Sequence, residues 1–262
     1  MLDYEFMRNA LTAGFLISIL CPLIGTFLVL KRFSMMGDTL SHSSFAGVTA
    51  GLIMGIAPGA ASLVYTPLSA LLIEYLRNKY QGYQEVVMSI VMTFNIGIAI
   101  ILASTGKIGT NITQFLFGSI LTVTAFDLLM ILGVMLVSLA FLYIYRHQLI
   151  YATFDEDGAR INGIDVTKLN YLFAALTGAT VGVSTRITGL LVISSILVIP
   201  TAAALNLRRG FFKTLLSAMA FGIISVMGGI VLSYYMDSAP GGTIALASVA
   251  VLILTFLFRR GS

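Results

Sequence analysis

The sequence predicts an all-α polytopic membrane protein, and three observations support that fold class. Hydrophobic residues make up 58% of the 262 residues and charged residues only 10%, whereas a soluble domain carries about 25% charged residues. The hydrophobic residues gather in runs of about 20, the length of a helix that crosses a bilayer. Lysine and arginine stand at the ends of these runs, where they act as a topology signal.

Nine apolar segments are candidate membrane-spanning helices, and eight crossings would also fit. They cover residues 9–30, 35–55, 60–76, 86–105, 125–145, 169–185, 188–205, 213–235 and 243–258. We expect a single transmembrane domain over residues 1–262, without a cleaved signal peptide, because the first apolar run is too long and lacks a basic start. The single Cys21 excludes a disulfide framework and a cysteine metal cluster.

The distribution of basic residues predicts the orientation. With the N-terminus outside, most basic residues fall on one side of the membrane. They are Lys31, Arg32, Arg77, Lys79, Arg146, Arg160, Lys168, Arg208, Arg209, Lys213, Arg259 and Arg260. By the positive-inside rule this side is cytoplasmic.

Two segments are predicted to differ from simple spans. Residues 108–119 are short and bounded by glycine and polar residues, which is typical of a short or re-entrant helix on the outer side. Residues 146–168 contain the longest polar stretch, 154–165, and are predicted to form a cytoplasmic loop with a small surface helix.

Asp38 and His42 are the candidate metal-binding residues. Their spacing of four places both on one face of a helix at membrane depth, where an ionisable residue indicates a functional site. Carboxylate and imidazole both bind first-row divalent cations, and a two-fold dimer would supply two of each. The alternative is structural: Asp38 caps the helix and His42 is a core histidine with its hydrogen bonds satisfied.

Two further patterns have structural alternatives that carry more weight. Gly47, Gly51 and Gly55 form a small-residue ladder, which favours close helix packing. Pro200 is expected to break or kink its helix, and the basic-ended turn after it could dock into a cytoplasmic partner. On the residues alone, a proline-kinked helix with a basic anchor is the better interpretation.

Catalytic signatures are missing from the sequence. There is no Gly-x-x-x-x-Gly-Lys-Ser/Thr loop for ATP phosphates and no Ser/His/Asp set for nucleophilic catalysis. The net charge of +4 is modest and gives no reason to expect a nucleic-acid surface. We therefore expect a non-enzyme without a permanently bound cofactor, and any ATP hydrolysis belongs to another chain.

The motifs resemble those of the metal-type ABC importer permeases, the zinc, manganese and iron uptake family. Residues 37–48, from Gly-Asp-Thr-Leu-Ser-His to Ala-Gly-Val, resemble its first signature, and residues 189–203 resemble its second. Residues 156–165 look like its cytoplasmic loop. The opening, Leu2 to Met7, is similar to the zinc members of Gram-positive bacteria, which predicts a bacterial, Gram-positive cell membrane.

The resemblance implies a mechanism and a set of partners. The chain would be a homodimeric permease with a fold like the vitamin B12 importer, and would move Zn²⁺, or else Mn²⁺, past Asp38 and His42. Cytoplasmic ATPase subunits would bind beneath it, and an extracellular metal-binding lipoprotein would deliver the ion. The helix over about 201–209 would be the coupling helix. Its contact residues would be Pro200, Thr201, Ala204, Asn206, Arg208 and Arg209.

Two other classes of protein remain as alternatives. An ion-coupled secondary transporter usually shows inverted repeats and more carboxylates at the midplane, and here only Asp38 lies well inside a predicted span. An intramembrane metalloprotease would need a His-Glu-x-x-His-like set, and the two histidines, His42 and His147, are too far apart.

Overall fold

The structure is a computed structural model that describes residues 5–105, 112–118 and 123–260, and within them the regular elements are helices. The predicted all-α class is confirmed. The helices are α1 (Glu5–Leu30), α2 (Met35–Met54), α3 (Pro58–Lys79), α4 (Gln84–Ser104), α5 (Ile112–Phe117), α6 (Ala125–Ile144), α7 (Arg146–Phe154), α8 (Glu156–Ile161), α9 (Val166–Thr188), α10 (Ile193–Asn206), α11 (Phe211–Met236) and α12 (Pro240–Arg260).

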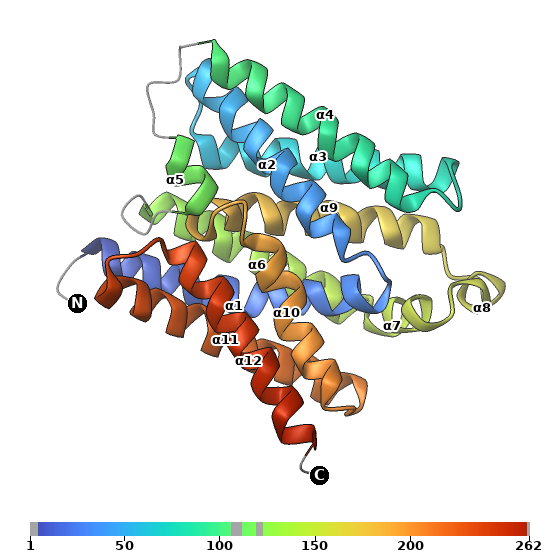
Figure 1. The fold of residues 1–262 in the computed structure, drawn as a ribbon. Helices are drawn as coiled ribbons and strands as arrows, with labels where there is room; N and C mark the ends of the chain where they lie inside the picture. The colour runs from blue at the N-terminus through green and yellow to red at the C-terminus, as the bar shows by residue number, and fades with distance from the viewer. Residues whose placement is uncertain (1–4, 106–111, 119–122, 261–262) are drawn as a thin grey trace.

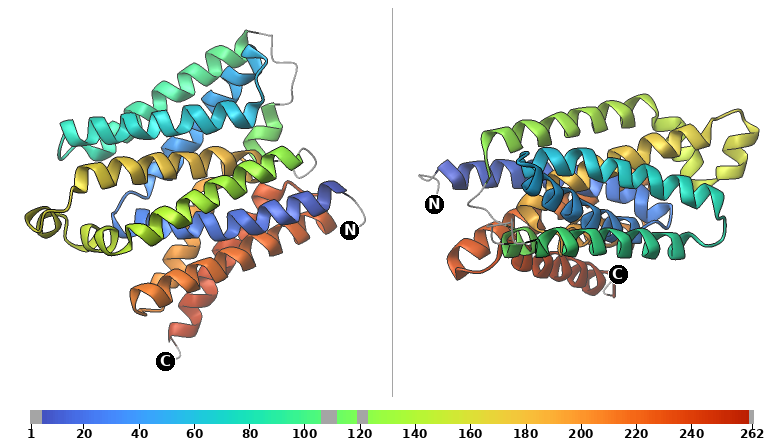
Figure 2. Two further views of the ribbon diagram at one scale, coloured as in Figure 1. Left: turned by 180° about the vertical axis from the view of Figure 1, so that it is seen from behind. Right: turned by 90° about the horizontal axis from the view of Figure 1, so that it is seen from above.

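The long helices run side by side and their connections gather at two ends of the molecule (Figures 1 and 2). One end holds the turn between α1 and α2, the turn between α3 and α4, the helices α7 and α8, and the turn between α10 and α11. These connections carry the basic residues from Lys31 to Arg209 that predicted the cytoplasmic side. We call this the basic end and the opposite side the far end.

Fewer helices qualify independently as membrane spans than the nine predicted. In the described residues six helices are long and apolar enough to cross a membrane, namely α1, α3, α4, α6, α11 and α12. Helices α9 and α10 qualify only as a pair, bent by 107° at the break between them. Helix α2 does not qualify, and its sequence explains why: its first half carries Asp38, His42 and several hydroxyl side chains.

Helix α2 lies inside the bundle and packs against α3, α4, α9 and α10. Small residues allow the close approach. A side chain at Gly47 would meet Ser62 and Tyr65 of α3, and one at Gly51 would meet Ala61. The packing interpretation of this ladder is therefore confirmed for Gly47 and Gly51. Gly55 has a different role, because it caps the C-terminus of α2 in the left-handed conformation at φ 69°.

Three glycines bring the backbone of separate segments together at the far end. A Cβ on Gly118, which follows α5, would collide with the Ile187 carbonyl oxygen of α9, and one on Gly189 would collide with Gly118. A Cβ on Gly241, in the first turn of α12, would meet the carbonyls of Phe117 and Thr188. Backbone hydrogen bonds from Leu190 to Phe115 and from Leu191 to Leu116 join α5 to the α9–α10 break, at 3.1 and 3.4 Å.

The two segments predicted to differ from simple spans are partly confirmed. Helix α5 is short, as expected of residues 108–119, although residues 106–111 and 119–122 lie outside the described part of the chain. The polar segment 146–168 holds more helix than predicted, because α7 precedes the small helix α8. The Asp155 side chain caps α8 by accepting from the Gly158 amide at 2.8 Å.

Candidate metal site on helix α2

The start of α2 is set by a tight turn of backbone hydrogen bonds. The Phe33 amide donates to the Leu28 carbonyl at 2.8 Å, and the Met36 amide donates to the Phe33 carbonyl at 2.9 Å. Ser34 is the N-cap residue, and its side chain makes no capping hydrogen bond. Asp38 lies further along the first turn and does not cap the helix. The alternative that Asp38 acts as an N-cap is therefore wrong.

Asp38 and His42 lie on the less buried face of α2. The Asp38 side chain is exposed and His42 is half-buried, and the charge of the Asp38 carboxylate acts on the imidazole. Among the described residues neither side chain takes part in a hydrogen bond or an ion pair. His42 is therefore not a core histidine with its bonding groups satisfied, as the second structural alternative requires.

The other polar side chains of α2 are satisfied within the chain. The Ser44 hydroxyl shares a hydrogen bond of 2.7 Å with Ser62 of α3, and Ser41 donates to the Asp38 carbonyl at 2.7 Å. Thr39 donates to the Met35 carbonyl at 3.1 Å. The face that carries Asp38 and His42 thus differs from the rest of the helix, because its polar groups have open coordination positions.

A single chain supplies only part of a metal site. Within the described residues, no group of three or more histidine, cysteine, aspartate or glutamate side chains could hold an ion. Cys21 is buried against Ser184 at 3.5 Å, and His147 is exposed at the start of α7 beside Arg146. Further ligands would have to come from water, backbone or another chain.

The residues predicted to contact an ATPase are mostly inaccessible. The expectation of a separate short helix after Pro200 is wrong, because α10 continues through Pro200 to Asn206. Proline inside a membrane helix is tolerated where neighbouring helices and hydroxyl groups stabilise the backbone, and here Thr201 donates to the Leu197 carbonyl at 3.3 Å. Pro200, Thr201, Ala204 and Asn206 are buried, whereas Arg208 and Arg209 are exposed at the basic end.

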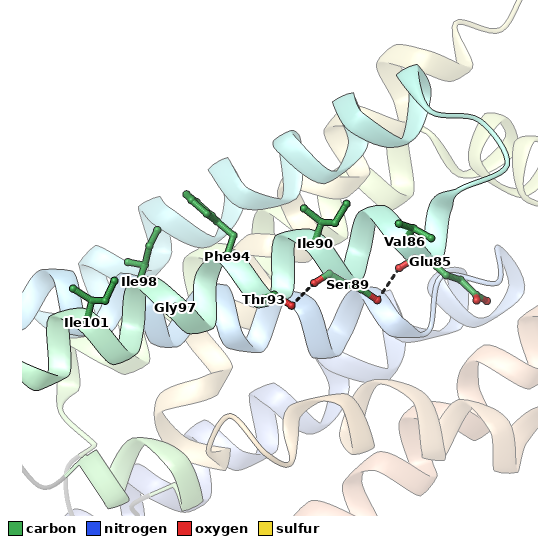
Figure 3. Close-up of a pocket in the computed structure, with 9 residues that line it drawn as sticks. All are labelled: Glu85, Val86, Ser89, Ile90, Thr93, Phe94, Gly97, Ile98 and Ile101. Carbon is green, nitrogen blue, oxygen red and sulfur yellow. Dashed lines mark hydrogen bonds between the residues drawn. The ribbon is translucent and has the colours of Figure 1, made fainter.

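A groove of about 770 Å³ follows one face of α4, and Glu85 is the one ionisable side chain among its lining residues (Figure 3). Its polar hydroxyls are engaged with the backbone. Ser89 donates to the Glu85 carbonyl at 3.0 Å and Thr93 to the Ser89 carbonyl at 2.9 Å. The remaining lining is chiefly apolar, with Ile90 and Phe94 exposed, so lipid or another helix would cover this face.

The bundle of apolar helices is that of a membrane protein, with one polar face on α2. The chain belongs to the ABC 3 transport family, which matches residues 3–259. The family predicted from residues 37–48 and 189–203 is therefore confirmed.

Curated relatives cover nearly the whole chain. A "Probable metal transport system membrane protein" of Treponema pallidum is 45% identical over 260 residues, covering 99% of this chain and 98% of the relative. The manganese transport system membrane protein MntC of Halalkalibacterium halodurans is 30% identical, with 98% and 89% covered. The high-affinity zinc uptake system membrane protein ZnuB of Haemophilus influenzae is 27% identical, with 98% of each chain covered. These relatives do not support a Gram-positive source.

A solved structure has the same arrangement of helices. It is described as PsaBC from Streptococcus pneumoniae in complex with Fab. It superposes with a TM-score of 0.86 at 27% identity and covers 97% of this chain and 92% of its own. The chain therefore has the fold of a membrane ABC permease.

Proposed function

We propose that the chain is the permease subunit of an ATP-driven importer of a divalent transition metal, and that Asp38 and His42 bind the ion in transit. The observation that carries the proposal is the pair itself. A charged aspartate costs roughly 2.5–3.5 kcal/mol on insertion scales at the centre of a membrane helix and less near its start, where Asp38 lies, and a partner offsets that cost. Among the described residues Asp38 has the nearby His42 and no hydrogen-bond partner, and both groups are metal ligands. The family favours this function over an ion-coupled secondary transporter.

A second copy of the chain would complete the site. The exposed Asp38 face cannot lie against lipid without a large cost, and two copies facing each other would bring four ligands to one ion. The proposal includes a homodimer, eight or nine membrane crossings per chain and a fold like that of the vitamin B12 importer permease. It also includes an extracellular binding lipoprotein, which would deliver the ion at the far end.

Zinc is the proposed ion and manganese the second candidate. Two aspartates and two histidines suffice for tetrahedral zinc, whereas manganese would need further oxygen ligands. The names of the relatives include both metals, which supports either choice. A strain that lacks its own uptake system should regain growth on limiting zinc when this transporter is expressed. Rescue on limiting manganese but not on limiting zinc would make manganese the first candidate.

The decisive variant is Asp38→Asn, which keeps the size of the side chain and removes its charge. We expect uptake of radioactive zinc to fall at least about 10-fold, because loss of a charged ligand weakens a cation site far more than it weakens a helix. Ser41→Ala is the matched control on the same turn, since within the described residues its hydroxyl donates to the Asp38 backbone carbonyl and to no other group. Parental uptake by Asp38→Asn would refute the metal-site assignment.

The ATPase contact is proposed at the exposed surface of the basic end. From the predicted set only Arg208 and Arg209 are exposed, and Ile161 at the end of α8 is 86% exposed although it is apolar. Arg208 and Arg209 offer charge and Ile161 offers an apolar group, so they are the two alternative contacts for the ATPase. Ile161→Glu and the double variant Arg208→Glu/Arg209→Glu should separate the two surfaces. The variant that loses metal-stimulated ATP hydrolysis while the chain stays folded identifies the contact.

A further inference from the structure

A cluster of charged side chains lies buried where α1 passes into α2, and transport chemistry does not account for it. Glu74 and Arg77, in the last turns of α3, form an ion pair of 2.7 Å, with side chains exposed by only 2% and 7%. A buried pair of charges costs more to desolvate than it usually returns in attraction. Its presence in a membrane helix therefore calls for a function.

The pair contacts the turn that starts α2. The Arg77 guanidinium lies 3.9 Å from the centre of the Phe33 ring, close enough for a cation–π contact. Glu74 accepts hydrogen bonds from Arg77 and, at 3.2 Å, from Asn78, so the carboxylate is held from two sides. Phe33 is thus fixed against a guanidinium that is itself fixed by its carboxylate.

A second contact holds the same turn from the side of α9. Lys31 donates to the Asn170 side-chain carbonyl at 2.6 Å, and its ammonium lies 5.6 Å from the Phe173 ring centre. Between these two anchors the chain turns through Arg32 at φ 60°, a conformation rare for a residue with a side chain. Helices α3 and α9 therefore set both the position and the direction from which α2 starts.

We propose that Phe33 and the Glu74–Arg77 pair are positioning residues for the ion site, because they fix the start of α2 and so the placement of Asp38 and His42. Asp38 lies five residues after Phe33, within the first turns of the helix. A helix transmits a shift at its start along its axis almost unchanged, and a metal site must be held within about 0.5 Å of its productive geometry. The inference rests on the metal site proposed above.

Cobalt titration of the purified full-length permease tests the inference, because the visible spectrum of bound Co²⁺ reports the geometry of its ligands. Phe33→Leu removes the ring and leaves every charge in place. We expect it to bind Co²⁺ about 10-fold more weakly with a shifted spectrum, the size of effect that supporting groups around a metal have. Phe33→Tyr keeps the ring and should bind as the parent does.

A double variant and a matched control complete the experiment. Glu74→Gln/Arg77→Met removes both charges together, so no lone buried charge threatens the fold, and it should weaken binding to a similar degree. Lys79→Met removes a cation two residues further along α3 that is exposed and lies 6.0 Å from the Tyr75 ring centre. Its affinity and spectrum should stay parental. Thermal unfolding of each variant shows that it is folded.

The two possible failures are distinguishable. A parental protein that binds no Co²⁺ would overturn the metal site and the inference together. If the parent binds Co²⁺, and folded Phe33→Leu and Glu74→Gln/Arg77→Met proteins bind it with parental affinity and spectrum, the positioning role is wrong and the metal site stands.

Discussion

Two ionisable pairs on neighbouring helices have opposite environments. Asp38 and His42 lie four residues apart on α2, one exposed and one half-buried, and neither forms a hydrogen bond within the part of the chain that the structure describes. Glu74 and Arg77 lie three residues apart on α3, almost fully buried, and bonded to each other. The difference separates a pair of charges that bond to each other from a pair that does not. The α3 pair is complete within one chain, whereas the α2 pair has no hydrogen-bond or ion-pair partner among the described residues.

The largest effect on stability is expected from breaking the α3 pair. Glu74→Ala leaves Arg77 buried without its carboxylate, so the free energy of unfolding should fall by about 3–5 kcal/mol. Chemical unfolding of the detergent-solubilised protein measures this. The double variant Glu74→Gln/Arg77→Met should recover most of the loss. A fall of less than about 1 kcal/mol for Glu74→Ala would mean that water reaches the pair and screens its charges.

An intermediate effect on stability is expected from titration of Lys31, which lies in the turn beside the α3 pair. Burial, with the positive charge of Arg77 as the second cause, lowers the pKa of Lys31 from 10.5 to about 8. Between these two values the unfolded chain binds a proton that the folded chain does not, so stability should rise as the pH increases from 8 to about 10.5.

Thermal unfolding at several pH values checks the expectation for Lys31. The melting temperature of the parent should rise through this window relative to Lys31→Met, which has no ammonium to titrate. If the difference between the two proteins stays constant with pH, Lys31 has its ordinary pKa and is not desolvated in the turn.

The smallest effect on stability is expected at the α2 pair, although transport depends on it. Asp38→Ala and His42→Ala remove side chains without hydrogen bonds, so unfolding free energies should change by no more than about 0.5 kcal/mol. Metal uptake should nevertheless be abolished in each. A large loss of stability in either variant would mean that the pair supports the fold, and would remove the contrast between the two helices.

Hydropathy predicted most of the helices closely, because their ends coincide with polar or basic residues. The predicted span 125–145 is observed as Ala125–Ile144, and 86–105 as Gln84–Ser104. Proline was less informative. Pro200 was predicted to break or kink its helix, and a break is absent, because neighbouring helices enclose α10 and stabilise it in a way that no local pattern reveals.

The candidate site was also only partly predictable. The spacing of Asp38 and His42 indicated a shared face, but capping could be excluded only once the helix was seen to start at Met35. The Glu74–Arg77 pair was missed, since Arg77 had the sequence context of an ordinary basic anchor at a helix end. Its burial depends on Phe33, more than 40 residues away in the sequence, and one sequence alone does not show that contact.

The crossing of Gly118, Gly189 and Gly241 at the far end limits how the protein can evolve. Any other residue at these positions would place a Cβ against the backbone of another segment, and backbone cannot move aside as a side chain can. Gly133 and Gly228, which have open space around them, are free to vary. Family members should therefore keep glycine at these three positions. At the far end they can differ only in the lengths and side chains of the surrounding loops.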